Sequence, residues 1–261
     1  MIKIGCISWS HRNDFSNGTM DVFKWMEHCK KECGLDGVEI WNNHFESLEE
    51  AYLQKIKEKS VKLDLPIYSV ATKCFFGDFS NEEIETAKST MREWLKATDY
   101  LGASIMRISV AGEDLRKEKR QEKVFQSLTE VIQEGKYPRI TVGIENQEPG
   151  LVQNVEDVKK MKEVTGGLLK VVLDNGSFTH KEDSYGFLEE ALADAAVVHV
   201  KFFDIRKDGS DRILDYARVK EILEHENYEG YVSIEYDSSE PAVRDVPKIA
   251  AYLKKALSEV G

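Results

Sequence analysis

Short apolar segments, each leading to one polar side chain, recur through the second half of the sequence and restrict the possible folds more than any other feature. In LLKVVLDNGSF (residues 168–178), five apolar residues surround one lysine and lead directly to Asp174. An apolar run this short, with glycines before and after it, is typical of a buried parallel strand. Asp174 is therefore expected at the C-terminal end of such a strand.

Three further segments repeat this design with a different polar residue. ITVGIEN carries Glu145, AVVHVKFFD carries His199, and YVSIEYD carries Glu235. Because side chains alternate between the two faces of a strand, the apolar residues can face outer helices while the polar residue faces inward. The carboxyl ends of parallel strands in a barrel meet at one mouth, so we expect these side chains and Asp174 to converge there as a catalytic metal site.

The spacing of the strand and helix patterns predicts an α/β fold, a (β/α)₈ TIM barrel. Eight strand segments occur, each followed by a helix pattern, at intervals of about 30 residues, which suits a barrel of about 250 residues. No linker or composition shift interrupts them, so residues 1–261 are predicted to form a single domain. An open, doubly wound sheet fits less well, because no G-x-G-x-x-G follows the first strand.

Two more charged residues are predicted to face the barrel interior. Alternation along GVEIW (Gly37–Trp41) turns Glu39 inward, and alternation along SIMRISV turns Arg107 inward. A buried charge requires a partner. Glu39 is therefore either half of an ion pair or a contact to substrate, and Arg107 either pairs with a carboxylate such as Glu39 or binds an anion.

The four residues at the strand ends offer carboxylate oxygens and one imidazole nitrogen. This donor set suits one divalent ion, with Mn²⁺ as the expected metal and Mg²⁺, Co²⁺ or Zn²⁺ as alternatives. Each residue taken alone could instead be a satisfied core histidine or half of a salt bridge. Their matching positions on consecutive strands favour a shared metal site.

Composition and charge exclude several classes of partner. With 36 Lys and Arg against 47 Asp and Glu, the formal charge is −11, and no basic run interleaves with aromatics, so no nucleic-acid partner is expected. The first residues, MIKIGCISWS, show neither a signal-peptide pattern nor a membrane span, which predicts a cytoplasmic protein without a membrane partner. Free thiols in a reducing compartment, either buried or on the surface, are expected at Cys6, Cys29, Cys33 and Cys74.

Two loops rich in aromatic side chains follow predicted strands. The loop WSHRNDFSNG holds Trp9 and His11, which either line a sugar pocket or pack the loop onto the barrel. In KCFFGDF (residues 73–79), three phenylalanines are more than an exposed loop usually carries. We expect them to cover the site together with Trp9, or to contact a second subunit, so a homo-oligomer is left open.

The chain resembles the xylose-isomerase-like superfamily of sugar isomerases and epimerases over essentially its full length. The matching motifs are GVEIW, GIEN at Glu145, LDNG at Asp174, HVK at His199 and Lys201, and the block ILDYARVKEILEHENYEGYVSIEYD that closes on Glu235. In ketose 3-epimerase-like members, the residues matching Glu145, Asp174, His199 and Glu235 bind one divalent ion, and the two glutamates also exchange the substrate's proton. The resemblance implies an isomerase or epimerase that acts on a small sugar-like polyol through an enediolate.

Two positions differ from the superfamily pattern. Many relatives have a histidine three residues after the aspartate, where this chain has Ser177, and the nearest imidazole is His180. Epimerase-like members carry an arginine six residues after the metal histidine, where this chain has Ile205, followed by Arg206. The metal ligands thus match while the substrate-contacting residues differ. The candidate substrate contacts are Trp9, His11, Glu39, Arg107, His180, Lys201 and Arg206.

Three other functions are compatible with this barrel. A dehydratase or lyase, including a C-glycoside-cleaving type, can use the same metal site. Apurinic endonucleases of the superfamily need extra histidines on the third and fourth strands, where this chain has YSVAT and MRISV, and acidic charge disfavours DNA. A metal-free binding protein is distinguished from the rest by elemental analysis.

Overall fold

The strands close into a parallel barrel in sequence order. The computed structural model describes residues 1–111, 114–177 and 184–257. Each strand pairs with the next one along the chain, and β8 pairs with β1, which closes the sheet. The strands are β1 (Ile2–Ile7), β2 (Gly37–Trp41), β3 (Ile67–Phe75), β4 (Ile105–Ala111), β5 (Thr141–Glu145), β6 (Leu169–Asp174), β7 (Ala195–Phe202) and β8 (Gly230–Tyr236). The predicted (β/α)₈ barrel is confirmed.

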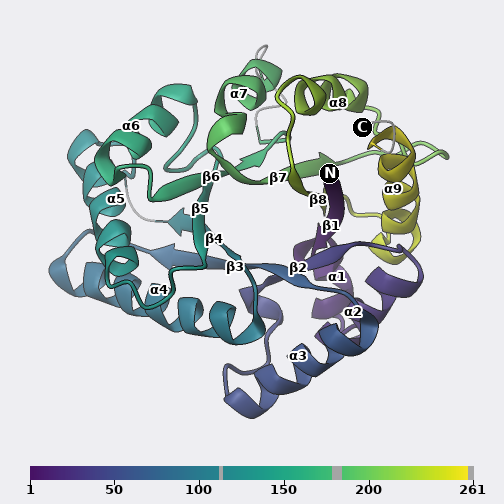
Figure 1. Cartoon of the computed structure of the whole chain (residues 1–261), viewed down its shortest axis with the longest axis horizontal. Coiled ribbons are helices and arrows are strands. Elements are labelled where there is room, and N and C mark those ends of the chain that lie inside the picture. The colour runs from purple at the N-terminus through teal and green to yellow at the C-terminus, as the bar shows by residue number, and fades with distance from the viewer. Residues whose placement is uncertain (112–113, 178–183, 258–261) are drawn as a thin grey trace.

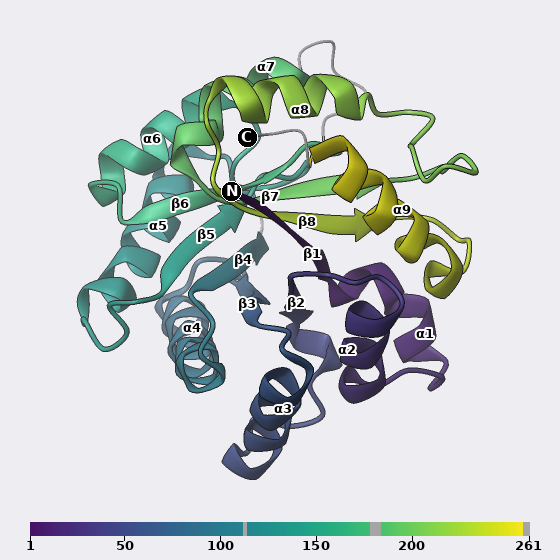
Figure 2. The ribbon, with the colours of Figure 1, turned by 45° about the vertical axis from the view of Figure 1, so that its right-hand side comes forward.

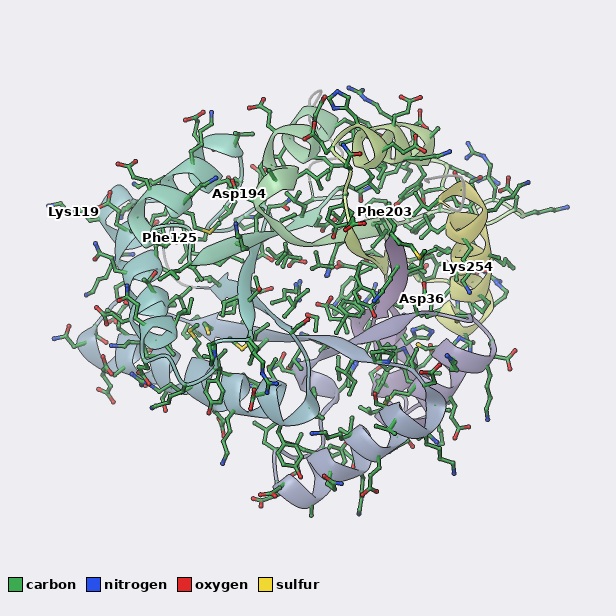
Figure 3. The ribbon with its side chains drawn as sticks, viewed as in Figure 1. Asp36, Lys119, Phe125, Asp194, Phe203 and Lys254 are labelled. Atoms are coloured by element: carbon green, nitrogen blue, oxygen red, sulfur yellow. The ribbon has the colours of Figure 1, made fainter. Side chains whose placement is uncertain are left out.

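Helices surround the ring of strands, as Figure 1 shows. They are α1 (Arg12–Ser16), α2 (Val22–Lys31), α3 (Glu50–Leu63), α4 (Asn81–Leu101), α5 (Glu118–Gln133), α6 (Val155–Thr165), α7 (Ser184–Ala191), α8 (Tyr216–His225) and α9 (Ala242–Leu257). The helices turn an apolar side to the sheet: on α5, Phe125 is buried against the strands, whereas Lys119 is exposed on the outside (Figure 3). The main core therefore lies between strands and helices.

The helix ends follow from capping residues in the sequence. At the start of α4, Ser80 Oγ accepts a hydrogen bond from the N–H of Glu83, and Gly102 ends the helix with φ of 78°. Asp21 caps α2 with its carboxylate in the same way. These side chains satisfy N–H groups that have no partner within the helix, and the glycine adopts a left-handed conformation without a Cβ clash.

The last helix covers the seam where the sheet closes. Helix α9 contacts both β1 and β8, and Figure 2 shows it beside these strands. Because those strands come from opposite ends of the chain, α9 helps to hold the two ends of the sheet together.

A smaller core fills the barrel interior. Tyr68, Val172 and Val197 pack together there, and Tyr231 stacks on Tyr68 with ring centroids 3.8 Å apart. The Tyr68 hydroxyl donates a 2.6 Å hydrogen bond to Ser233 Oγ. These residues precede the strand ends, so they plug the interior beneath the polar residues at the mouth.

Strand β3 is longer than predicted and includes part of the second aromatic loop. Residues 73–75 continue the strand past Thr72. Phe75 is 56% exposed, whereas Phe76 and Phe79 are buried in the outer core with ring centroids 6.0 Å apart. The ring at the end of β3 thus faces solvent, whereas the two rings that follow the strand are packed in the core.

The cysteines and the helix lengths bear on the expectations about compartment and membrane. The cysteines are free, as expected, and all four are buried. Burial raises the pKa of Cys33 and Cys74 to about 12, so these thiols stay protonated. Among the described helices, none combines the length and apolar character that a bilayer crossing requires.

Candidate metal centre and its pocket

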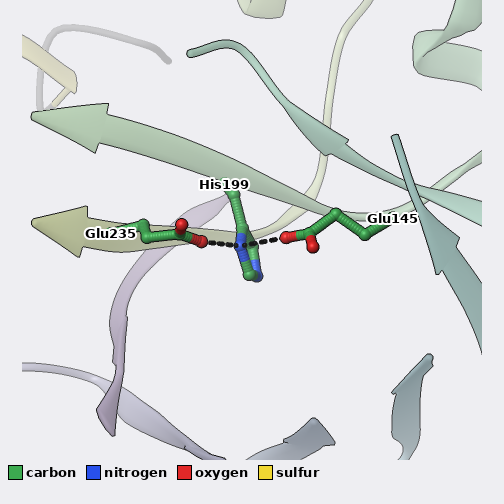
Figure 4. A group of neighbouring side chains, drawn as sticks. All are labelled: Glu145, His199 and Glu235. Atoms are coloured by element: carbon green, nitrogen blue, oxygen red, sulfur yellow. Dashed lines mark hydrogen bonds and ion pairs between the residues drawn. The ribbon is translucent and has the colours of Figure 1, made fainter. Parts of the chain in front are cut away.

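The C-terminal ends of β5 to β8 place polar side chains close together. Glu145 ends β5 and Asp174 ends β6. In the sheet register, Asp174 is opposite His199, and Lys201 is opposite Glu235. Glu145 and Glu235 approach the His199 imidazole from opposite sides (Figure 4). The parity along each strand thus brings residues from four strands to one mouth.

Three of these residues form a compact buried group. His199 Nδ1 lies 2.9 Å from Glu235 Oε2 and 3.5 Å from Glu145 Oε1. One nitrogen or oxygen atom from each of the three residues lies within 4.8 Å of the other two. All three side chains are buried. Such a group is suited to hold a single cation.

Glu39 holds the opposite side of the imidazole. His199 Nε2 lies 3.0 Å from Glu39 Oε2, and neither side chain is exposed to solvent. Burial acts to lower the pKa of His199, but Glu39, together with Glu145 and Glu235, raises it well above 6.5. When Nε2–H donates to Glu39, the ring tautomer is fixed and Nδ1 points at the two other glutamates. Glu39 is therefore the ion-pair partner of His199.

The donor atoms fit a divalent ion. With Nε2–H bonded to Glu39, the Nδ1 lone pair faces carboxylate oxygens and requires a proton or a cation between them. Glu145 Oε1 is buried and receives no hydrogen bond within the described chain. Ligand atoms about 2.1 Å from one ion and at right angles lie about 3 Å apart. The observed separations of 2.9 and 3.5 Å are of this size.

Asp174 is next to this group and is already paired. Lys201 Nζ lies 2.7 Å from Asp174 Oδ2 and 3.0 Å from Glu235 Oε1. Burial acts to lower the pKa of Lys201, but Glu235 and Asp174 raise it above its usual value. Lys201 is therefore an ammonium ion that bridges two of the predicted metal ligands.

Arg107, on the neighbouring strand β4, neutralises Glu145. The two side chains form a buried ion pair, and Ser109 Oγ donates to the same carboxylate at 3.3 Å. Burial acts to raise the pKa of Glu145, but Arg107 and His199 hold it below its usual value. Of the alternatives left open for Arg107, the structure has the ion pair, with Glu145 as partner in place of Glu39.

A cavity of about 700 Å³ opens above the candidate metal centre. Its wall includes Glu145, Asp174 and Glu235, the cationic Arg107 and Lys201, and the rings of Trp9 and Trp41. This volume is in the range of small-molecule sites, which are about 300–1,000 Å³. Aromatic rings beside charged and hydrogen-bonding groups suit a small polar ligand with C–H faces.

Several predicted pocket residues lie elsewhere. The ring of His11 is fully buried, and its Nδ1 accepts a 3.2 Å hydrogen bond from Trp25 Nε1, so it packs the loop onto the barrel. Arg206 bonds to the backbone oxygen of Asp211 and lines a different cavity. His180 lies outside the described residues.

The aromatic cover of the pocket also differs from the prediction. Trp9 lines the cavity, and the guanidinium of Arg12 lies 3.8 Å from the centroid of its ring. Phe75, Phe76 and Phe79 are not part of the described cavity wall, so the prediction that they cover it is wrong. Phe76 and Phe79, which follow the end of β3, pack in the outer core instead.

Two asparagines that support the site were not predicted as site residues. Asn146 Oδ1 accepts a hydrogen bond from the N–H of Asp174 at 2.8 Å, and Asn146 Nδ2 donates one to the carbonyl oxygen of Asp174 at 3.0 Å. Asn175 Oδ1 accepts the N–H of Lys201 at 2.9 Å. Each asparagine directly follows a predicted ligand in the sequence and clamps the next strand. That repeated pair, an acidic residue followed by Asn, was the signal in the sequence.

The chain belongs to the xylose isomerase-like TIM barrel family, which it matches over residues 30–256. A curated relative is the inosose dehydratase of Clostridium perfringens (strain 13 / Type A). It is 22% identical in an alignment of length 305 that covers 99% of this chain and 97% of the relative.

Solved structures share the fold at low sequence identity. D-Psicose 3-epimerase from Clostridium cellulolyticum H10, solved with D-tagatose, has a TM-score of 0.79 and 16% identity, with 99% of each chain covered. A protein named IOLI, solved with a zinc atom, has a TM-score of 0.79 and 15% identity, also with 99% of each chain covered. Enzymes that convert sugars are therefore among the structural neighbours of this chain.

Proposed function

We propose that the protein is a divalent-metal-dependent isomerase or epimerase that moves a proton on a sugar or sugar-like polyol. The observation that carries this proposal is the buried group of Glu145, His199 and Glu235 beneath a pocket of small-molecule size. The fold shared with D-psicose 3-epimerase adds support.

The proposed ligands of the ion are Glu145, Asp174, His199 and Glu235. Three carboxylates and one imidazole favour Mn²⁺, with Mg²⁺ and Co²⁺ as alternatives, and the zinc atom of the IOLI structure supports Zn²⁺ as another. When bound, the ion supplies Lewis acidity that polarises a substrate carbonyl and makes the neighbouring C–H more acidic.

Glu145 and Glu235 are the proposed acid/base pair. Burial opposes ionisation of both, but Arg107 acts on Glu145, and Lys201 and His199 act on Glu235, so the pKa of each carboxyl is below its usual value. Each glutamate is thus ionised and able to accept a proton from carbon. Because the two lie on opposite sides of His199, one ionised glutamate can remove the proton, and the other, after it takes up a proton from solvent, can protonate the opposite face of an enediolate, which inverts that carbon.

Three further side chains are proposed to bind the substrate. Arg107 and Lys201 line the cavity and present N–H donors to substrate hydroxyl groups. Trp9 offers a ring against which the C–H face of a sugar can pack while water is excluded. These residues would set the orientation of the substrate above the glutamates.

A dehydratase is the second candidate, and Lys201 is the observation that favours it. Its ammonium group lies in the cavity wall beside Glu235, where it can donate a proton to a leaving hydroxyl. The inosose dehydratase relative supports the same reaction class. Proton removal by one glutamate and loss of water would then replace proton return.

The test is a panel of sugars and cyclic polyols incubated with Mn²⁺-loaded protein in D₂O. An isomerase or epimerase incorporates deuterium into a product of unchanged formula, whereas a dehydratase releases water. Glu235→Gln keeps a ligand oxygen and removes the base, so Mn²⁺ should stay bound while turnover falls by roughly 10²-fold or more. Glu240→Gln, the same change on an exposed side chain after β8, is the control. Full turnover by Glu235→Gln would refute the role of this residue.

A further inference from the structure

Both oxygens of Asp174 accept hydrogen bonds. Oδ1 accepts a hydrogen bond from the N–H of Gly176 at 2.8 Å. Oδ2 accepts hydrogen bonds from Ser177 Oγ and from Lys201 Nζ, each at 2.7 Å. The glycine donor belongs to the backbone, and the serine oxygen has a short reach. Lys201 is the donor with a long, flexible stem. For Asp174 to bind an ion through Oδ2, Lys201 must move.

The same ammonium group also engages Glu235. Lys201 Nζ lies 3.0 Å from Glu235 Oε1, while the other oxygen of that carboxylate faces His199 Nδ1 at 2.9 Å. A single ammonium therefore bridges two carboxylates that the proposed ion would bind. A divalent ion and this ammonium compete for the same oxygens, because each neutralises the same negative charge.

The backbone of Lys201 is fixed, so only its side chain can move. Its N–H donates to Asn175 Oδ1 at 2.9 Å, and its carbonyl accepts a hydrogen bond from the Tyr216 hydroxyl. The stem packs directly on Gly176, where an added Cβ would lie 2.4 Å from the Cβ of Lys201. The side chain is 14% exposed and lines the cavity, which gives the ammonium group space to enter.

The charges at the barrel mouth explain why the lysine is present. The buried carboxylates of Glu39, Glu145, Asp174 and Glu235 surround His199, with Arg107 and Lys201 as the cations paired with them. Buried carboxylates without a cation are costly. Without Lys201 and without an ion, Asp174 would have no cationic partner among the pairs that the structure describes.

We infer that Lys201 is a built-in counter-ion that occupies the Asp174–Glu235 position in the metal-free protein and that a divalent ion displaces into the cavity. This inference rests on the proposed metal site. It means that the barrel is held together without metal, that metal affinity is reduced by the competition, and that loading the site delivers an ammonium group to the substrate.

Lys201→Met tests the competition, because it keeps the length of the stem and removes the charge. Chelator-stripped wild-type protein and variant are titrated with Mn²⁺ by calorimetry, and the stripped proteins are melted. We expect Lys201→Met to bind Mn²⁺ at least about tenfold more tightly and to melt at a lower temperature than wild type when stripped. Lys201→Gln, which retains a hydrogen-bond donor, repeats the measurement if the methionine variant does not fold.

Lys73→Met is the matched control. Lys73 lines the same cavity and is exposed, and it makes no ion pair with a described residue. Loss of the same charge there should change Mn²⁺ affinity less than loss of Lys201. If wild type binds Mn²⁺ and the Lys201 variants bind it with equal or lower affinity, the inference is overturned while the proposed function stands. If stripped wild type binds neither Mn²⁺ nor Zn²⁺, the proposed function itself fails.

Discussion

Lowering the pH from 7 to 5 should weaken the folded state through His11. Its ring is fully buried, Nδ1 accepts the Trp25 N–H at 3.2 Å, and Nε2 has no hydrogen-bond partner within the described chain. The ring of His28 lies 5.3 Å away, centroid to centroid. A second proton would add charge here without a carboxylate partner. Burial, together with His28 and His44, therefore lowers the pKa of His11 from 6.5 to about 3.

The sign and size of the effect follow from these pKa values. Because the pKa of His11 is lower in the folded chain, the unfolded chain takes up the proton first. The contribution of His11 to stability is complete above pH 6.5 and decreases as the pH falls toward 3. One pH unit corresponds to about 1.4 kcal/mol, so the step from 6.5 to 5 removes about 2 kcal/mol from the free energy of unfolding.

Urea unfolding at pH 7, 6 and 5, with EDTA to exclude bound metal, measures this loss. His11→Asn retains an acceptor near the position of Nδ1 but cannot take up a proton, so its free energy of unfolding should fall by about 2 kcal/mol less than that of wild type. The shared carboxylates cancel in this difference. His225→Asn, at a side chain that is 74% exposed, should behave like wild type. Equal pH slopes for wild type and His11→Asn would refute the reasoning.

Two further comparisons test the packing of the aromatic loop and of the Lys201 stem. Phe76→Ala should destabilise the protein by about 3–5 kcal/mol because the ring is fully buried, whereas Phe75→Ala should cost much less because that ring is 56% exposed. Thermal melts compare the two variants, and equal losses of stability would contradict the different burial of the two rings. Gly176→Ala should cost about 1–3 kcal/mol, since its Cβ would lie 2.4 Å from the Cβ of Lys201. Thermal melts should show a smaller loss in a Lys201→Gly background, which lacks that Cβ, and an unchanged loss there would contradict the contact as the cause.

The barrel and the strand-end residues could be predicted because both depend on local periodicity. The alternation that sends Val172 and Asp174 to one face is visible in a single segment, and so is the alternation of Val197 with His199. A closed parallel barrel then brings the strand ends together whatever the detailed packing. No knowledge of contacts between distant segments was needed.

The choice of ion-pair partners could not be predicted, because it depends on the register between strands. Arg107 is opposite Gly143 in the sheet, which leaves its guanidinium within reach of Glu145 two residues farther along β5. Glu39, which the sequence offered as one possible partner of Arg107, contacts His199 instead. A sequence fixes the face on which a charge lies but not the strand position that it meets.

The loop aromatics were misplaced for a related reason. The predicted third strand stopped at Thr72, and the next three residues were assigned to a loop, although they alternate between exposed and buried positions as a strand does. In a strand, a shift of one residue moves a side chain from the solvent face to the core face, so the position of the strand end decides where Phe75 points. His11 was assigned to the pocket as one of two alternatives, and its bond to Trp25 is consistent with the other.

The inward face of β8 carries packing residues and a proposed catalytic residue at successive depths of the barrel. Tyr231 stacks on Tyr68 in the inner core, and Ser233 Oγ accepts a 2.6 Å hydrogen bond from the Tyr68 hydroxyl. Glu235, two residues farther on, meets His199 and Lys201 at the mouth. Since the plug fixes the strand that carries Glu235, the proposed base is held by packing below it as well as by charges beside it. A substrate that binds from the open side therefore meets a carboxylate whose position is set before it arrives.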